Sequence, residues 1–270
     1  MREVSFSKVV GSGNDFILID ARHKSLRGQI PALAKTWCNR KRGIGADGLL
    51  WIAPSRKADA RMRIFNPDGS EAAMCGNGLR CVAWYLHRQD HGRKQLRLET
   101  GAGIMQAQVI EPEQIRIAMT MPRNLRLGIK LTLRGIQYVL HAVNTGVPHA
   151  VLPVRSLERT DLSVLGPLIR HHRLFKPSGT NVDLLRIDSL HQIAVRTYER
   201  GVEAETLACG TGAVASVIIG TALGRLQPPV QVMTASGETL SIGFDQSFKP
   251  WKGLYLEGPA RILFEGTLVL

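Results

Sequence analysis

Apolar and polar residues alternate along much of this chain, which is the pattern of half-buried β-strands. The first such segment covers residues 4–10, and the apolar run 17–19 after it predicts a buried strand. Glycine and proline turns separate the later segments. We expect further strands at 49–53, 61–65, 95–99, 104–110, 114–121, 136–143, 150–152, 182–185, 193–198, 230–234, 239–244, 253–257 and 261–268. The chain is therefore predicted to consist mainly of sheet.

Helical spacing of apolar residues is found in fewer places. Two helices are expected at 31–40 and 157–169. Two more follow cysteines. Apolar positions after Cys75 predict a helix that ends near Gly92, and a helix rich in small residues runs from Cys209 to about residue 224.

Cys75 is predicted to lie where a glycine-rich loop becomes a helix. A thiol at that position faces unpaired backbone N–H groups and the positive end of the helix dipole. Both favour the thiolate, and the same N–H groups can hold a carboxylate. The alternative for a single such site is a small buried residue beside glycines that only shape the turn, and for one site alone we favour that alternative.

A second copy of the motif changes this interpretation. The segment Cys75-Gly-Asn-Gly recurs 134 residues later as Cys209-Gly-Thr-Gly. Two other glycine turns recur in the same order at nearly the same spacing, Gly13 with Gly146 and Gly45 with Gly179. Three turns in one order and at one spacing indicate an internal repeat of about half the chain.

The repeat predicts an α+β fold with two pseudo-symmetric domains. Each domain is expected to be a curled, mostly antiparallel sheet around a central helix, because that helix is apolar nearly all round. The domains are predicted at 1–121, carrying Cys75, and 122–260, carrying Cys209, with a seam at 122–124. A pseudo-two-fold axis would bring the two thiols face to face across a cleft.

Composition and charge argue against a nucleic-acid-binding protein and against a membrane protein. The chain has 270 residues and a net charge of +13, but its basic clusters at 40–42 and 170–173 are not interleaved with aromatic residues, so we expect no nucleic-acid partner. The longest uncharged run, 208–224, is short for a membrane span and rich in Gly and Ala, so a buried helix explains it better. Four cysteines without an export signal predict reduced thiols in the cytoplasm.

Two opposed thiols suit the inversion of a carbon centre, because one group removes a proton from one face and the other delivers a proton to the opposite face. A proton α to a carboxylate is far less acidic than a thiol, so the protein must stabilise the developing negative charge. The backbone amides of Gly76, Asn77, Gly210 and Thr211 are candidates for that task. No dinucleotide fingerprint, P-loop, pyridoxal-lysine setting or metal-ligand spacing is visible, so neither a cofactor nor a metal is expected.

Six motifs, in order over essentially the whole chain, resemble the diaminopimelate epimerase family. They are Gly11-Ser-Gly-Asn-Asp-Phe, Asn66-Pro-Asp-Gly-Ser-Glu, Cys75-Gly-Asn-Gly-Leu-Arg-Cys, Gly146-Val-Pro-His, Gly179-Thr-Asn-Val and Tyr198-Glu-Arg-Gly with Ala208-Cys-Gly-Thr-Gly-Ala. The resemblance implies a cofactor-independent enzyme that interconverts LL- and meso-2,6-diaminopimelate in lysine and peptidoglycan precursor synthesis. It also implies the two-domain fold, a last strand at 261–270 that returns to the first domain, and a homodimer.

The resemblance also implies the roles of individual residues. Cys75 and Cys209 would be the base and acid pair, with roles exchanged in the reverse direction. The four amides would hold the reacting carboxylate, and His149 with Glu199 would set the thiol pKa values. Residues that would bind the remainder of the substrate are Asn14, Asn66, Asn181, Glu199 and Arg200. The structural alternatives are an Asx-turn for Asn14, a turn hydrogen bond for His149 and a surface ion pair for Glu199 and Arg200.

This chain departs from the family pattern at two positions. Val147 stands where many members have a substrate-contacting Asn, and Gly48 stands where some members have Gln. Cys38 and Cys81 have no assigned role. A Cys75–Cys81 disulfide would destroy the proposed base, and a disulfide between the two facing thiols would inactivate the enzyme reversibly.

Three other functions are compatible with some of these features. A proline-racemase-like enzyme also uses two opposed thiols. The substrate here is expected to carry a second carboxylate, because Arg200, Asn66 and Asn181 are suited to bind one. A thiol redox sensor predicts one low-pKa cysteine beside a resolving partner, not two copies in separate domains. A basic, nucleic-acid-associated module would show salt-dependent binding to DNA.

Overall fold

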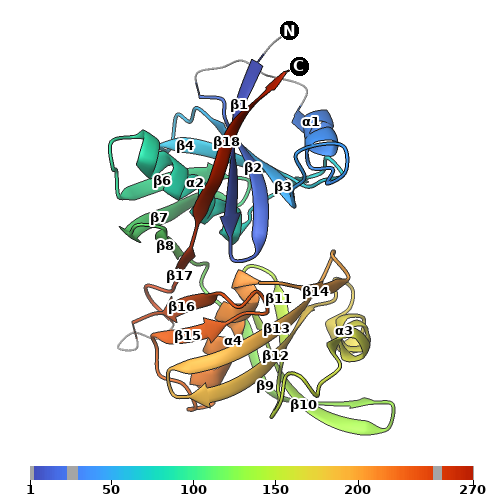
Figure 1. Cartoon of the computed structure of the whole chain (residues 1–270). Helices are drawn as coiled ribbons and strands as arrows, with labels where there is room; N and C mark the ends of the chain where they lie inside the picture. Colours follow the sequence, from blue (N-terminus) through green and yellow to red (C-terminus); the bar gives the residue numbers. More distant parts are fainter. Residues whose placement is uncertain (1–2, 23–29, 246–250, 270) are drawn as a thin grey trace. The chain divides into compact units, whose positions relative to one another are not determined.

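The computed structural model describes residues 3–22, 30–245 and 251–269 (Figure 1). The expectation of no export signal was drawn partly from Met1 and Arg2, which lie outside the described residues. The chain divides into two compact units, Met1–Ala118 with Gly258–Leu270 and Met119–Glu257. Helices and strands mix in both units, with strands predominating, so the predicted α+β class is confirmed. Within the described ranges, every helix is too short or too polar to cross a bilayer.

Over the residues that the structure describes, the first unit is built from β-strands and two helices. Their bounds are β1 (Glu3–Gly11), β2 (Asn14–Asp20), α1 (Ile30–Trp37), β3 (Gly48–Ala53), β4 (Ala60–Phe65), β5 (Glu71–Ala72), α2 (Gly76–Gln89), β6 (Gln95–Thr100), β7 (Gly103–Glu111), β8 (Gln114–Ala118) and β18 (Arg261–Val269). Strands β2 and β3 are parallel, as are β4 and β6, whereas β1–β2, β3–β4, β4–β5, β6–β7 and β7–β8 are antiparallel.

The second unit repeats this order of elements. Its bounds are β9 (Arg123–Leu133), β10 (Ile136–Asn144), β11 (Pro148–Pro153), α3 (Leu162–Arg170), the 3-10 helix η1 (Arg173–Phe175), β12 (Asn181–Ser189), β13 (Gln192–Glu199), β14 (Ala204–Thr206), α4 (Gly210–Ala222), β15 (Val230–Met233), β16 (Thr239–Gly243) and β17 (Tyr255–Pro259), the last of which crosses the boundary between the units. Here β11–β12 and β13–β15 are the parallel pairs.

The repeat extends to the register of the strands. Phe16 lies opposite Gly48 in the first unit, and His149 lies opposite Asn181 in the second, so both positions recur 133 residues later. The antiparallel pair of Leu49 and Phe65 likewise recurs as Val182 and Tyr198. Residues in these paired strands therefore have definite counterparts in the other half, and chemical differences between the counterparts can be read directly.

The two units differ in where one edge strand comes from. In the second unit β10 pairs with β9, which directly precedes it in the chain. In the first unit the equivalent neighbour of β1 is β18, with Val4 opposite Leu268 (Figure 1, where the red β18 lies along the blue β1). Strand β9 was not predicted from the sequence. Its burial explains why, because only Leu131 and Leu133 of this strand are buried, too few to produce a strand pattern.

Several predicted boundaries were wrong. Helix α1 ends at Trp37 rather than at residue 40, and the carbonyl of Trp37 accepts the N–H of Gly45, whose φ is +79°. Helix α3 begins at Leu162 rather than at residue 157, because the carboxylate of Asp161 accepts the first free amides and starts the helix there. Strand β8 ends at Ala118, and the short β5 and β14 were not expected.

Each unit has a helix against its sheet, but the two helices are buried to different extents. Every residue of α4 from Gly212 to Gly220 is buried, and the helix packs on β10, β11 and β12. Helix α2 packs on β1, β7 and β8. The expectation of a helix apolar nearly all round was wrong for its second half, where Arg88 and Gln89 are exposed. The N-terminal turns of both helices, which carry the cysteine motifs, are nevertheless held against the sheet.

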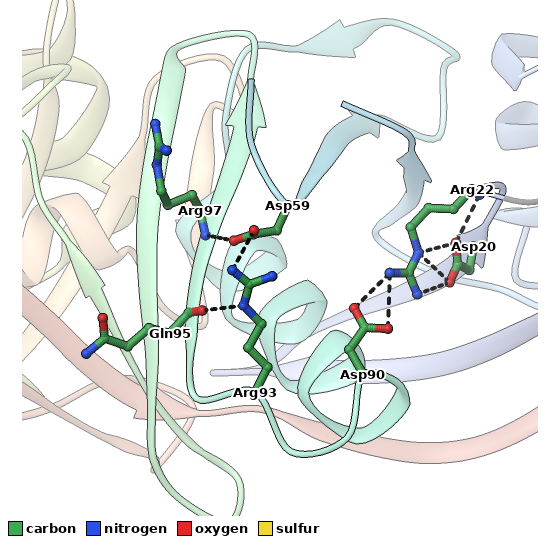
Figure 2. A network of polar contacts seen from close by, with 7 residues as sticks. All are labelled: Asp20, Arg22, Asp59, Asp90, Arg93, Gln95 and Arg97. Carbon is green, nitrogen blue, oxygen red and sulfur yellow. Dashed lines mark hydrogen bonds and ion pairs between the residues drawn. The ribbon is translucent and has the colours of Figure 1, made fainter. Parts of the chain in front are cut away.

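Ion pairs hold the C-terminal end of α2 (Figure 2). The C-cap residue Asp90 pairs with Arg22 at 2.8 Å, and Arg22 also binds Asp20 at the end of β2 at 2.8 Å. A second cluster lies beside it, in which the carboxylate of Asp59 pairs with Arg93 at 2.8 Å and accepts the backbone N–H of Arg97. An acidic C-cap opposes the helix dipole, so the cation of Arg22 offsets an unfavourable charge.

We expect Arg22→Met to lower the free energy of unfolding by about 1–2 kcal/mol, because it leaves two partly buried carboxylates without their shared cation. Arg56→Met is the matched control, since Arg56 is exposed in the same unit. Urea denaturation of the two variants measures the difference. Equal stability of both variants would show that the pairs of Arg22 contribute nothing.

Candidate active site

Cys75 is the N-cap of α2, with φ −142° and ψ 121°. Its sulfur accepts the backbone N–H of Gly78 at 3.4 Å, and the side chain is half-buried. The turn that precedes it is closed by Asn66, whose amide nitrogen Nδ2 donates to the hydroxyl of Ser70 at 2.9 Å. The predicted place of Cys75, at the change from loop to helix, is therefore confirmed.

Asn14 and Asn77 are joined directly in this unit. Nδ2 of Asn77 donates to Oδ1 of Asn14 at 2.7 Å, and Nδ2 of Asn14 donates to Asp47 at 3.1 Å. The guanidinium of Arg80, a fully buried side chain, donates to Oδ1 of Asn77 at 2.8 Å and to the hydroxyl of Ser12 at 2.6 Å. One buried cation thus holds the loop of Asn14 and the first turn of α2 together.

Ion pairs of charged residues also fix the loop of Asn14. Asp15 pairs with Lys8 and Arg40 at 2.6 Å each, and Arg40 also reaches Asp47 at 2.7 Å. Burial by itself would raise the pKa of Asp15, but hydrogen bonds and charge attraction from Arg40 and Lys8 outweigh it and lower that pKa to about 2. Asp15 therefore stays ionised in the folded protein, and the network that positions Asn14 persists.

Cys209 is the N-cap of α4 and lies in a more polar setting. Its sulfur is 3.4 Å from Oγ1 of Thr211, and that hydroxyl is 2.9 Å from Nε2 of His149. Nδ1 of the same imidazole is 2.8 Å from the carboxylate of Asp183, which also accepts the hydroxyl of Thr197 at 2.7 Å. His149 is thus not a simple turn residue but the centre of a hydrogen-bonded chain that reaches the thiol.

The surroundings of Cys209 disfavour its thiolate. Desolvation by the protein raises the pKa of Cys209 well above its usual value, and the negative charges of Glu199 and Asp183 raise it further. The hydrogen bond between Cys209 and the Thr211 hydroxyl, and one from the Gly212 amide, act in the opposite direction and are the weaker effects. Cys209 is therefore predominantly a thiol near neutral pH, the state required of a proton donor.

The remaining candidates of this unit lie at the ends of β12 and β13. Oδ1 of Asn181 accepts the backbone N–H of Arg200 at 2.8 Å, and its Nδ2 donates to the carbonyl of Pro148 at 3.0 Å. The guanidinium of Arg200 donates to the carbonyl of Ser178, while Glu199 accepts the hydroxyl of Thr206 at 2.6 Å. Asn181 therefore fixes the backbone from which Arg200 extends.

The two departures from the family pattern have different structural settings. A Cβ at Gly48 would lie 3.0 Å from the carbonyl oxygen of Phe65, so a longer side chain there requires that carbonyl to shift. Val147 is half-buried in the turn between β10 and β11, where its carbonyl accepts the N–H of Thr145. Its apolar side chain cannot replace the hydrogen bonds of an Asn.

Three residues that surround the two cysteine motifs were not identified from the sequence: Arg80 in the first unit, and Asp183 and Thr197 in the second. Arg80 had a visible signal, because it is a cation among the apolar positions of a helix that the pattern predicts to be buried. Asp183 and Thr197 are likewise polar residues among the apolar residues of a strand. Within the described ranges, the structure contains no group of three or more His, Cys, Asp or Glu side chains arranged to bind a metal.

Comparison with known proteins decides the family. The sequence pattern of the family described as diaminopimelate epimerase matches residues 6–125 and 141–263. The chain belongs to the diaminopimelate epimerase family. The resemblance carried by the six motifs is thereby confirmed. A relative from Chlorobaculum tepidum, described as diaminopimelate epimerase, is 41% identical over 264 residues, which cover 96% of this chain and 99% of the relative.

Solved structures place this member of the diaminopimelate epimerase family in a wider fold group. A PhzF-family phenazine biosynthesis protein from Bacillus anthracis has a TM-score of 0.74 at 16% identity, with 100% of both chains covered. A hydroxyproline epimerase from Agrobacterium vitis, with bound trans-4-hydroxy-L-proline, has a TM-score of 0.72 at 18% identity, covering 99% of this chain and 91% of the other. At these identities the likeness concerns the fold.

Proposed function

We propose that this protein is a diaminopimelate epimerase that inverts an α-carbon and interconverts LL- and meso-2,6-diaminopimelate. The observation that carries the proposal is the pair of cysteines at equivalent N-caps, Cys75 on α2 and Cys209 on α4, in a chain of this family. We further propose that the two units are the two domains of the family fold, that the enzyme acts in the cytoplasm as a homodimer, and that it needs no cofactor. The family resemblance supports these points.

The reaction needs one thiolate and one thiol, on opposite faces of the α-carbon. In one direction Cys75 takes the α-proton, the electrons of the C–H bond move into the adjoining carboxylate, and Cys209 delivers its S–H proton to the other face. Cys75 ends as the thiol and Cys209 as the thiolate, so the reverse reaction exchanges their roles. The N–H bond to the Cys75 sulfur and the raised pKa of Cys209 both support this assignment at rest.

The developing charge on the reacting carboxylate requires fixed donors. The amides of Gly76 and Asn77 at the start of α2, and those of Gly210 and Thr211 at the start of α4, are helix N-terminal groups of the kind that stabilise such charge. The family assigns them to that carboxylate. Because these amides belong to the fixed backbone of the two helices, their dipoles do not need to reorient during the reaction.

The distal end of the substrate carries an ammonium and a second carboxylate. Arg200 supplies a planar fork suited to the carboxylate, and its backbone is fixed by Asn181. Asn14 and Asn66 are the amides proposed to complete the binding, with Glu199 as the acceptor for an ammonium. We also propose that His149 and Glu199 adjust the protonation of the thiols, which is supported by the contact of His149 with Thr211 and by the effect of Glu199 on the pKa of Cys209.

Isotope exchange tests the proposal. Incubation of the purified protein with LL-diaminopimelate in deuterated water, without added cofactor, is expected to yield the meso isomer with deuterium at the inverted carbon, detected by NMR and chiral chromatography. L-Proline is the matched control substrate, because it lacks a second carboxylate. Exchange with L-proline alone would support a proline-racemase-like enzyme instead, and no exchange with either substrate would reject the two-thiol scheme.

A further inference from the structure

A continuous chain of hydrogen bonds runs through the second unit to Cys209. It passes from Thr197 to Asp183 at 2.7 Å, from Asp183 to His149 at 2.8 Å, from His149 to Thr211 at 2.9 Å, and from Thr211 to the Cys209 sulfur at 3.4 Å. The inner members are almost fully buried, with exposed fractions of 0% for Asp183, 1% for His149 and 3% for Thr197. The roles of Asp183 and of the Thr211 hydroxyl are not explained by substrate binding.

The direction of each hydrogen bond follows from the carboxylate at the inner end. The hydroxyl of Thr197 donates to one oxygen of Asp183, and the other oxygen is the acceptor for Nδ1–H of His149. A neutral imidazole that carries its proton on Nδ1 has a lone pair on Nε2, which accepts the hydroxyl proton of Thr211. The oxygen of Thr211 is then free to accept the S–H proton of Cys209. Asp183 thereby determines the orientation of every group up to the thiol.

The first unit shows that the fold does not require these polar residues. By strand register the counterparts of Asp183 and Thr197 are Leu50 and Ile64, and the counterpart of His149 is Phe16. The same contrast lies beneath the helix starts. A Cβ at Gly212 would lie 2.3 Å from the Asp183 carboxylate, whereas a Cβ at the equivalent Gly78 would lie 2.8 Å from Leu50. Apolar side chains fill these positions behind Cys75, so the polar chain belongs to the chemistry of Cys209.

We propose that the Thr211 hydroxyl and His149 relay a proton to and from Cys209, and that Asp183 is the positioning residue that holds His149 in the accepting tautomer. This inference rests on the proposed function only in that Cys209 must lose a proton before it can serve as a base. In that step the S–H bond breaks and its proton binds Oγ1 of Thr211. The hydroxyl proton of Thr211 moves at the same time to Nε2 of His149. The products are a thiolate and an imidazolium paired with Asp183.

The relay answers a specific electrostatic difficulty. When the proton of Cys209 leaves to solvent, the thiolate adds a net negative charge to its surroundings. Desolvation opposes that charge, and so do the negative charges of Glu199 and Asp183 nearby. Transfer to His149 adds no net charge, since the thiolate is compensated by the imidazolium and the imidazolium by Asp183. The same carboxylate that disfavours a bare thiolate thus favours the ion pair.

Thiol alkylation without substrate tests the inference. The full-length protein is treated with iodoacetamide over a range of pH, and mass spectrometry of peptides reports modification of Cys209 alone. We expect Thr211→Val, which removes the hydroxyl at nearly constant shape, to slow alkylation of Cys209 at neutral pH about 10-fold, which equals about 1.4 kcal/mol. Thr211→Ser, which keeps the hydroxyl, is the matched control and is expected to retain the wild-type rate.

Asp183→Asn separates a positioning role from a simple charge effect. A carboxylate that acts only through its charge raises the pKa of Cys209, so its removal would speed alkylation. A carboxylate that orients His149 and stabilises its imidazolium has the opposite effect, so we expect Asp183→Asn to slow alkylation about 10-fold. In the Thr211→Val background, where the relay is already broken, we expect Asp183→Asn to have no further effect. Faster alkylation of Asp183→Asn, or equal rates for Thr211→Val and Thr211→Ser, would overturn the proposal. Because no diaminopimelate is used, the result is independent of whether that compound is the substrate.

Discussion

Replacement of either Cys75 or Cys209 by alanine is expected to lower kcat for diaminopimelate epimerisation at least 1,000-fold, within the range of ~10²–10⁴ that a positioned acid or base contributes. Each thiol is needed in both directions, once to remove a proton and once to deliver one. Neither N-cap offers a nearby substitute on its own helix, since the residues that follow are Gly76-Asn77-Gly78 and Gly210-Thr211-Gly212. Measurement of kcat and KM in both directions is the test.

Cys38→Ala is the matched control for these variants. The Cys38 thiol is buried beside α1, and desolvation raises its pKa to about 11, so it remains a protonated, unreactive group near neutral pH. We expect Cys38→Ala to keep kcat within about two-fold of wild type. A Cys75 or Cys209 variant with comparable activity would contradict a mechanism in which both thiols exchange protons with the α-carbon.

Arg80→Met is expected to lower the free energy of unfolding by about 2–4 kcal/mol, which is large for a single site. The substitution keeps an unbranched side chain but removes the donors to Ser12 and Asn77 and a longer contact of 3.4 Å from Nε to the carbonyl of Pro259. Those buried acceptors then lack their partners. Because Asn77 also contacts Asn14, we expect kcat/KM to fall about 10-fold in the same variant.

Arg88→Met separates this effect from a general sensitivity of α2. Arg88 is exposed on the same helix, so its replacement is expected to change stability by no more than about 0.5 kcal/mol. Guanidinium denaturation, followed by circular dichroism, compares the two variants. Similar midpoints for Arg80→Met and Arg88→Met would show that the buried guanidinium does not hold the loop of Asn14.

Most of the fold could be predicted from the sequence because glycine turns recur where the backbone needs them. Gly13, Gly45, Gly146 and Gly179 all have positive φ, between 68° and 111°, which other residues adopt at a cost. The repeat is therefore visible in the spacing of these glycines, although the side chains between them differ. Strand β9 could not be found in this way, since most of its side chains are exposed and no alternation results.

Candidate site residues could be predicted from the sequence where the residue type itself has an unusual chemistry. They could not be predicted where the importance of a residue depends on its contacts with distant residues. Cys75 and Cys209 stood out through their repeated motif. Asp183, by contrast, is one acid in an apolar strand, and its importance comes from contacts with His149 and Thr197, which lie 34 and 14 residues away. No short-range pattern records such contacts, so only the pairing of β11, β12 and β13 reveals them.

The origin of β18 has a consequence for how the protein is made. Strand β1 leaves the ribosome long before its neighbour β18, which begins only at Arg261. At ~5–20 residues per second, β1 exposes an unpaired edge for on the order of tens of seconds during synthesis. The second unit is continuous in the chain and can fold during that interval. The half synthesised first is thus completed after the other half, and a ribosome that stalls before Arg261 leaves it without its closing strand.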